Sequence, residues 1–257
     1  MKFNVIEVTQ KIIDFIRDYY AKYNLKGAVI GISGGKDSAV VAALFTKALG
    51  SENVVGLWLP CHSRDEDKKD AYLLSQELGF KLHEFDLTKL YDSYVEQIKA
   101  QNDVKDEDLI DANINIKPRL RMTTLYYYAS MLSKINQGGY LVCGTSNNAE
   151  TFVGYFTKGG DNVCDIQVIK ELFVDEIIEI GDYLQIPYHI CHKTPDDGLS
   201  GLSDEKKLGF SYADVKKVAL EIENGIIDNT VNKETKEKIL AKHRDNFHKY
   251  HIPTYRR

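Results

Sequence analysis

The chain has 257 residues, a length that suits one large α/β domain, and its 38 acidic against 33 basic residues give a formal net charge of −5 that argues against a nucleic-acid-binding protein. Its four cysteines are widely spaced and include no C-x-x-C pair, so they predict neither a zinc site nor a redox pair and favour reduced thiols in a cytoplasmic protein. The chain begins without the apolar run of a signal peptide and has no stretch apolar enough to span a membrane, so we expect neither a membrane nor a nucleic acid among its partners.

The first predicted element is an amphipathic helix over residues 5–20, where apolar side chains recur at helical spacing. Residues 27–30 are a short apolar run that predicts a buried strand, and residues 39–45 predict a helix. The residues between them, Gly-Ile-Ser-Gly-Gly-Lys-Asp-Ser, therefore form a strand-to-helix turn. Adjacent glycines let the backbone approach a ligand, and the start of a helix offers unpaired N–H groups, so this turn predicts a phosphate site.

Two better-known phosphate loops do not fit the turn. A Walker A loop would need glycine in place of Ile30 and Ser or Thr in place of Asp37, and a Rossmann fingerprint would need glycine in place of Ser33. The turn instead resembles the S-G-G-x-D-S pyrophosphate loop of ATP pyrophosphatases, which adenylate a carboxylate or carbonyl oxygen. An ordinary glycine turn explains the two serines and the aspartate poorly, because hydroxyls can hold phosphate oxygens and a carboxylate can hold Mg²⁺. The loop residues expected to bind ATP are Gly31, Ile32, Ser33, Gly34, Gly35, Lys36, Asp37 and Ser38.

Strands and helices continue to alternate after this turn. Strands are predicted at residues 53–60, 82–87, 140–144 and, as a short fifth strand, 188–191, and helices at residues 65–79 and 172–184. Residues 90–111 indicate a helix followed by a surface loop, and Pro118 suits the first turn of the next helix. The pattern predicts an α/β fold, a doubly wound, mostly parallel five-stranded sheet with helices on both faces, formed by residues 1–257 as a single domain. Ligands are expected beyond the carboxyl ends of its strands.

Four later segments carry further motifs. They are N-I-K-P-R-L-R-M at residues 115–122, G-T-S-N-N-A-E at 144–150, G-Y-F-T-K-G-G-D at 154–161 with the further Asp165, and D-E-K-K-L-G-F-S-Y at 204–212. They resemble the segments N-x-K-A-R-x-R-M, G-T-x-x-x-A-E, G-[YF]-F-T-K-x-G-D and D-E-x-x-L-G-x-[ST]-Y of the ammonia-dependent NAD synthetases. The resemblance extends from residue 5 to residue 253 and implies an adenine-nucleotide α-hydrolase-like fold.

The resemblance also implies a reaction, that of a ligase forming a C–N bond. The nicotinate carboxylate of deamido-NAD attacks the α-phosphate of ATP and releases pyrophosphate, and ammonia then displaces AMP to give NAD. Mg²⁺ would be held by Asp37 and Glu150, with Asp37 as the catalytic residue, and Thr145 would contact ATP. A homodimer is implied, and ammonia rather than glutamine is the expected nitrogen source. The residues that would hold deamido-NAD are Arg119, Lys158, Asp165, His248 and Lys249.

Two positions depart from the family pattern. Val174 replaces an ATP-contacting lysine, for which Lys170 is a possible substitute, and Asp196 replaces a Thr or Ser in the proline- and glycine-rich loop 193–205, which we expect to act as a lid. The sequence leaves two other functions open. A tRNA-modifying ATP pyrophosphatase would use the same loop, but it predicts cysteine pairs and a basic face, and a non-catalytic nucleotide-binding module would not need both Asp37 and Glu150.

Overall fold

The computed structural model describes residues 3–194, 203–225, 228–250 and 252–255. Within these ranges five strands form one sheet in the order β3-β2-β1-β4-β5, and all neighbouring strands are parallel, which confirms the predicted sheet. The central strands are covered on both faces, so their buried residues form apolar runs without alternation. The strands are β1 (Leu25–Gly31), β2 (Val54–Trp58), β3 (Lys81–Glu84), β4 (Gly139–Gly144) and β5 (Ile166–Gln167).

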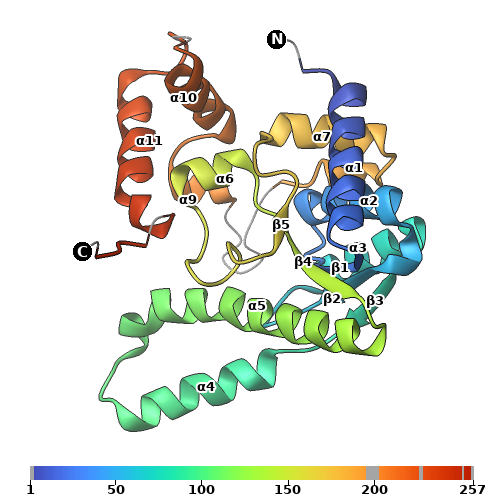
Figure 1. Ribbon diagram of the computed structural model, residues 1–257. Coiled ribbons are helices and arrows are strands. Elements are labelled where there is room, and N and C mark those ends of the chain that lie inside the picture. The colour runs from blue at the N-terminus through green and yellow to red at the C-terminus, as the bar shows by residue number, and fades with distance from the viewer. Residues whose placement is uncertain (1–2, 195–202, 226–227, 251, 256–257) are drawn as a thin grey trace.

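Helices lie on both faces of the sheet (Figure 1). Neighbouring residues of β1 point to opposite faces: Ile30 packs with the helices of one face, and Val29 packs against α5 on the other. The first face is covered by α1 (Val5–Lys22), α2 (Lys36–Leu49), α3 (Asp65–Leu78), α7 (Val174–Tyr183) and α8 (Tyr188–Cys191). The second face is covered by α5 (Ile110–Ile135), and α4 (Thr88–Gln101) packs against α5.

A separate apolar cluster joins a short helix that follows β4 to two helices near the C-terminal end of the described chain. It contains Phe152, Val215 and Ile239, one from each of α6 (Asn148–Val153), α10 (Tyr212–Asn224) and α11 (Lys233–Asp245). The short remaining elements are α9 (Asp204–Leu208) and the 3₁₀ turns η1 (Ser51–Asn53), η2 (Asp106–Leu109) and η3 (Phe247–Lys249). Through α6, this cluster reaches the carboxyl edge of the sheet, where β4 ends.

Two predictions about local structure are wrong. Residues 188–191 form the single helical turn α8 rather than a strand, because Ile190 and Cys191 both donate backbone hydrogen bonds to the carbonyl of Pro187, at 2.9 and 3.1 Å. A short apolar run suits a strand and a helical turn equally well, and the fifth strand is instead the two-residue β5.

Pro118 does not begin a helix but lies inside α5, which starts at Ile110. A proline there removes one helical hydrogen bond. Its ring packs against the 154–161 loop so closely that a Cβ on Gly160 would lie 2.9 Å from the Cβ of Pro118.

Candidate active site

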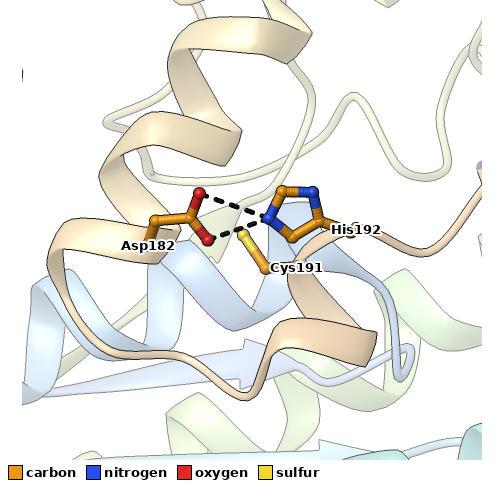
Figure 2. Close-up of side chains that lie close together, drawn as sticks. All are labelled: Asp182, Cys191 and His192. Atoms are coloured by element: carbon orange, nitrogen blue, oxygen red, sulfur yellow. Dashed lines mark hydrogen bonds and ion pairs between the residues drawn. The ribbon is translucent and has the colours of Figure 1, made fainter.

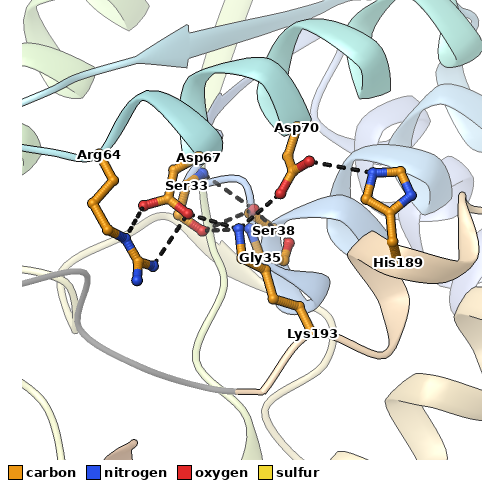
Figure 3. Close-up of polar contacts among 8 residues, drawn as sticks. All are labelled: Ser33, Gly35, Ser38, Arg64, Asp67, Asp70, His189 and Lys193. Atoms are coloured by element: carbon orange, nitrogen blue, oxygen red, sulfur yellow. Dashed lines mark hydrogen bonds and ion pairs between the residues drawn. The ribbon is translucent and has the colours of Figure 1, made fainter. Parts of the chain in front are cut away.

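The loop between β1 and α2 is held in shape by its own side chains. The Ser38 hydroxyl donates to the carbonyl of Gly35 at 3.0 Å and accepts from the backbone N–H of Ser33 at 3.2 Å (Figure 3). Gly34 has a φ of +81°, and a Cβ at that position would lie 2.5 Å from the carbonyl oxygen of Asp67 on α3. This backbone path therefore requires glycine at residue 34, both for its left-handed conformation and for the close approach of α3.

A cavity of about 370 Å³ opens over this loop. It lies at the carboxyl ends of β1, β2 and β4, where a parallel sheet is expected to bind ligands, and α5 and the 154–161 loop close its other side. Its volume is in the range of small-molecule and cofactor sites. The structure brings together here all of the residues predicted to contact ATP or metal, namely Gly31, Ile32, Ser33, Gly34, Gly35, Lys36, Asp37, Ser38, Thr145 and Glu150.

Two carboxylates in the cavity are positioned by one asparagine. The side-chain amide of Asn147 donates to Asp37 at 3.1 Å, and its oxygen accepts from the backbone N–H of Glu150 at 3.0 Å. Burial raises the pKa of Asp37 and raises that of Glu150 well above its usual value, and the charge of Asp37 raises the Glu150 pKa further. Two like charges in one buried site are unfavourable unless a cation lies between them. This oxygen-only donor set fits Mg²⁺, which commonly takes one or two carboxylates beside phosphate oxygens.

Two more carboxylates that sequence reasoning missed also line the cavity. Asp161 accepts from the backbone N–H of Thr157 at 2.8 Å, and Asp204 accepts from the hydroxyl of Tyr155 at 3.2 Å. Burial raises the pKa of Asp161, and both residues contribute to the raised pKa of Glu150. Each residue belongs to a motif quoted above, so the signal was present in the sequence, but nothing in the pattern indicated that both face the same cavity.

Beside the loop, basic and acidic side chains from two segments form a polar network that includes the positively charged Arg64 and Lys193 (Figure 3). Nζ of Lys193 lies 2.7 Å from carboxylate oxygens of both Asp67 and Asp70, and Nε of Arg64 lies 3.3 Å from Asp67. Burial opposes the charge of Lys193, but the hydrogen bonds to the two aspartates raise its pKa. Arg64, Asp67 and Lys193 line the cavity, so charged side chains at the start of α3 border the same cavity as the loop.

The described lining of the cavity includes none of the five residues predicted to hold deamido-NAD. Four of them form a second cluster. Arg119 donates to the carbonyl of Lys158 at 3.1 Å, Nζ of Lys158 donates to the carbonyl of His248 at 2.9 Å, and Nζ of Lys249 donates to the carbonyl of Gly154 at 2.7 Å. Burial lowers the pKa of Lys249.

Asp165 lies apart from this cluster, directly before β5 and beside Val142 of β4. Its carboxylate accepts from the backbone N–H of Val142 at 2.8 Å and from the Tyr126 hydroxyl at 3.0 Å.

The two arginines of the 115–122 motif point in different directions, because residues two apart on a helix lie on different faces. Arg121, rather than Arg119, lines the cavity, and its Nε donates to the carbonyl of Leu59 at 3.1 Å. Burial lowers the pKa of Arg121. Val174 begins α7 and packs against the α6–α10–α11 cluster, Lys170 is exposed and outside the cavity lining, and Asp196 lies outside the described residues.

A family model described as NAD synthase matches residues 8–253 of the chain. The chain is 41% identical over 216 residues to the NH₃-dependent NAD⁺ synthetase of Carboxydothermus hydrogenoformans, which covers 84% of this chain and 85% of that protein. It is 37% identical over 235 residues to the NH₃-dependent NAD⁺ synthetase of Finegoldia magna, covering 91% and 92%.

Solved structures with this fold point to the same family. NMN synthetase from Francisella tularensis superposes with a TM-score of 0.85 at 30% identity, over 99% of both chains. NH₃-dependent NAD synthetase from Campylobacter jejuni superposes with a TM-score of 0.80 at 27% identity, over 99% of this chain and all of that one. Because the family model and these relatives match most of the chain, it belongs to the NAD synthase family.

Proposed function

We propose that this protein makes NAD from deamido-NAD and ammonia at the expense of ATP, through an adenylated intermediate. The observation that supports this most strongly is the cavity lined by the pyrophosphate loop, which contributes Asp37, and by Glu150. The chain aligns with most of the length of the NH₃-dependent NAD⁺ synthetases of Carboxydothermus hydrogenoformans and Finegoldia magna. A tRNA-modifying enzyme is not favoured by these comparisons.

We propose roles for the residues that would surround ATP. The amides and hydroxyls of the loop would hold the β- and γ-phosphates, with Arg64 and Lys193 available to neutralise their charge and Thr145 as a further contact. Asp37 and Glu150 would hold Mg²⁺, which neutralises the negative charge of the leaving pyrophosphate. Because these groups are fixed before the reaction by the hydrogen bonds of Asn147 and Ser38, catalysis rests on positioning and on electrostatic stabilisation.

For deamido-NAD we propose the second cluster together with Asp165. Arg119, Lys158 and Lys249 each donate a hydrogen bond to a neutral backbone carbonyl. A dinucleotide phosphate would be a stronger acceptor for each, because it carries a negative charge. His248 exposes its ring beside them, and Asp165 offers a carboxylate to hydroxyl or amide groups.

We further propose a homodimer formed through α4 and α5. The pair lies on the outer side of the molecule (Figure 1) and exposes large apolar side chains, which is typical of an obligate interface. These side chains are Tyr94, Ile98, Ile114, Tyr127, Met131 and Ile135, which are 37–71% exposed.

We also propose that residues 1–257 act as one domain in the cytoplasm. All four cysteines lie within the described residues and are free thiols, in keeping with a reducing compartment. Among the residues that the structure describes, no helix is both long and apolar enough to cross a membrane.

A second acceptor is supported by one observation, the similarity to NMN synthetase from Francisella tularensis. That likeness suggests nicotinate mononucleotide, which lacks the AMP half of deamido-NAD, as an alternative substrate. The test is to supply purified protein with ATP, Mg²⁺ and ammonium and either acceptor, and to measure kcat/KM for amide formation. We expect deamido-NAD to be preferred, and a preference for the mononucleotide would overturn this assignment.

The same assay with Asp37→Asn tests the metal assignment. Removing one charge-stabilising group commonly costs about 3 kcal/mol of barrier, so the rate should fall roughly 100-fold while the fold is kept. Glu66→Gln, which alters an exposed acid on α3, is the matched control and should leave the rate unchanged. Near-normal activity of Asp37→Asn would count against the magnesium site.

A further inference from the structure

Three side chains of the kinds that bind metal ions lie close together outside the ATP cavity, between the end of α7 and the end of α8. Asp182 lies near the end of α7, Cys191 is the last residue of α8, and His192 follows it. Figure 2 shows the Cys191 sulfur beside the contact between Asp182 and His192. In the described part of the chain, the carboxylate oxygen, thiol sulfur and imidazole nitrogen all lie within 4.8 Å of one another.

The cluster is already close to the geometry of a tetrahedral cation site. Nε2 of His192 lies 2.9 and 3.2 Å from the two carboxylate oxygens of Asp182. Bonds of about 2.0–2.3 Å to a tetrahedral cation place neighbouring donor atoms about 3.3–3.8 Å apart. A cation could therefore replace the His192–Asp182 hydrogen bond with small side-chain movements and no change in the backbone.

Packing holds two of the three donors in place. The His192 ring stacks on Tyr188, with ring centroids 3.9 Å apart and an interplanar angle of 17°. The Cys191 thiol is fully buried against α7, where a Cβ on Gly181 would lie only 2.3 Å from its sulfur. A glycine inside a helix lowers its stability, and here it makes the space that the sulfur occupies.

We propose that Asp182, Cys191 and His192 form a binding site for a divalent cation of the zinc class, separate from the ATP cavity. Sulfur, imidazole and carboxylate donors together suit Zn²⁺, whereas Mg²⁺ and Ca²⁺ prefer oxygen donors only. Three protein ligands leave a fourth position for water, which the exposed side of Asp182 and His192 can accommodate.

Binding would proceed by proton release, without oxidation or reduction. Burial raises the pKa of Cys191 to about 11, so its thiol is protonated at neutral pH, and its hydrogen bond goes to the carbonyl of Ile178 at 3.5 Å. When the cation binds, the S–H bond breaks, the proton passes to solvent, and both bonding electrons stay on sulfur to form the bond to the cation.

The site would anchor the approach to the ATP cavity. Lys193 follows His192 directly and reaches Asp67 and Asp70 on α3. A metal ion that joins α7 to His192 would therefore fix the backbone one residue before Lys193, whose charged side chain lines the cavity. No sequence pattern indicates this site, because its ligands come from two segments and form no recognised zinc motif.

Cobalt titration tests the proposal without relying on activity. The full chain is stripped of metal with a chelator, supplied with excess Mg²⁺ to occupy oxygen-only sites, and titrated with Co²⁺. We expect one equivalent to produce a near-ultraviolet thiolate-to-cobalt band, which Zn²⁺ then displaces. His192→Gln and Asp182→Asn alter exposed side chains, so they should fold, and each should weaken binding by at least about 10–100-fold, the loss caused even by outer-shell changes.

Cysteine variants identify the sulfur. Cys191→Ser should abolish the band, and Cys164→Ser, the matched control, should keep it. Zn²⁺ should raise the melting temperature of the parent chain but not that of His192→Gln, because a ligand stabilises only the state that binds it. A titration without a thiolate band, or a band that survives His192→Gln at full strength, would overturn the proposal.

Discussion

The side-chain amide of Asn147 lies 3.1 Å from Oδ1 of Asp37, so the residue that caps α6 also orients the carboxylate at the start of α2. The same Asn147 side chain accepts from the backbone N–H of Glu150 at 3.0 Å. One residue thus holds Asp37 and the start of α6, which carries Glu150, and its hydrogen bond to Asp37 can be removed while the cap is kept.

Asn147→Ser should separate the two contributions. Serine keeps the N-cap acceptor at about the strength of asparagine, so the melting temperature should hold. It lacks the amide donor to Asp37, and loss of a hydrogen bond to a charged group should lower kcat about 10–100-fold. Asn147→Ala should show the same loss of rate and a further stability loss of about 1 kcal/mol. A parent-level rate in the serine variant would show that Asp37 needs no such support.

Glu150→Gln should stabilise the metal-free protein at neutral pH while removing activity. The raised pKa of Glu150 means that the folded state binds more protons than the unfolded state above the usual glutamate pKa, so stability falls as pH rises through that range. Glutamine can still accept from the backbone N–H of Asn147 but carries no charge.

With a chelator present, we expect the melting temperature of Glu150→Gln at pH 7 to exceed that of the parent by about 2–4 °C. In a chain of this size, that shift corresponds to about 1 kcal/mol in the free energy of unfolding. The gain should shrink near pH 4, where the parent carboxyl is also neutral. An equal gain at both pH values would contradict the electrostatic cause.

Gly34→Ala should damage the loop through two effects at once. The residue has a φ of +81°, and its new Cβ would meet the Asp67 carbonyl at 2.5 Å. Because the loop must move, ATP binding and the rate should fall about 100-fold, as misplacements near 1 Å commonly cause. Gly225→Ala is the matched control, since its φ is +67° but nothing lies within 4 Å. Equal losses of activity and melting temperature in the two variants would rule out the steric effect.

Arg121→Ala and Arg119→Ala should affect different substrates. Arg121 lines the ATP cavity, so its loss should raise the KM for ATP or lower pyrophosphate release roughly 10–100-fold, the effect of losing a charged hydrogen bond. Arg119 contacts Lys158 instead, so its loss should raise the KM for deamido-NAD and leave that for ATP near the parent value. The reverse pattern would contradict the division between the two sites.

The sequence predicted those elements whose structure is determined by residues close together in the chain. The strand, glycine turn and helix at residues 27–45 are fixed by neighbouring residues, and so the loop and the parallel sheet were predicted correctly. The family motifs identified Thr145 and Glu150, which the fold brings to the same cavity as Asp37.

Features that depend on contacts distant in sequence were missed. The choice between strand and helix at residues 188–191 rests on a single turn after Pro187, which the hydrophobic pattern does not encode. Lys193 shares carboxylates with α3, more than a hundred residues earlier in the chain, and the pairing appears only when the fold brings both segments together. The same holds for Arg121, whose direction is set by how α5 packs on the sheet.

The central claim is that the carboxylate of deamido-NAD is adenylated in the cavity above the pyrophosphate loop. Deamido-NAD labelled with ¹⁸O in its nicotinate carboxylate, supplied with ATP, Mg²⁺ and ammonium, tests it directly by mass spectrometry of the products. We predict that NAD forms together with AMP carrying one ¹⁸O, because the carboxylate oxygen leaves on the α-phosphate, and that pyrophosphate stays unlabelled. Label in pyrophosphate or inorganic phosphate, or NAD formed with unlabelled AMP, would contradict this account.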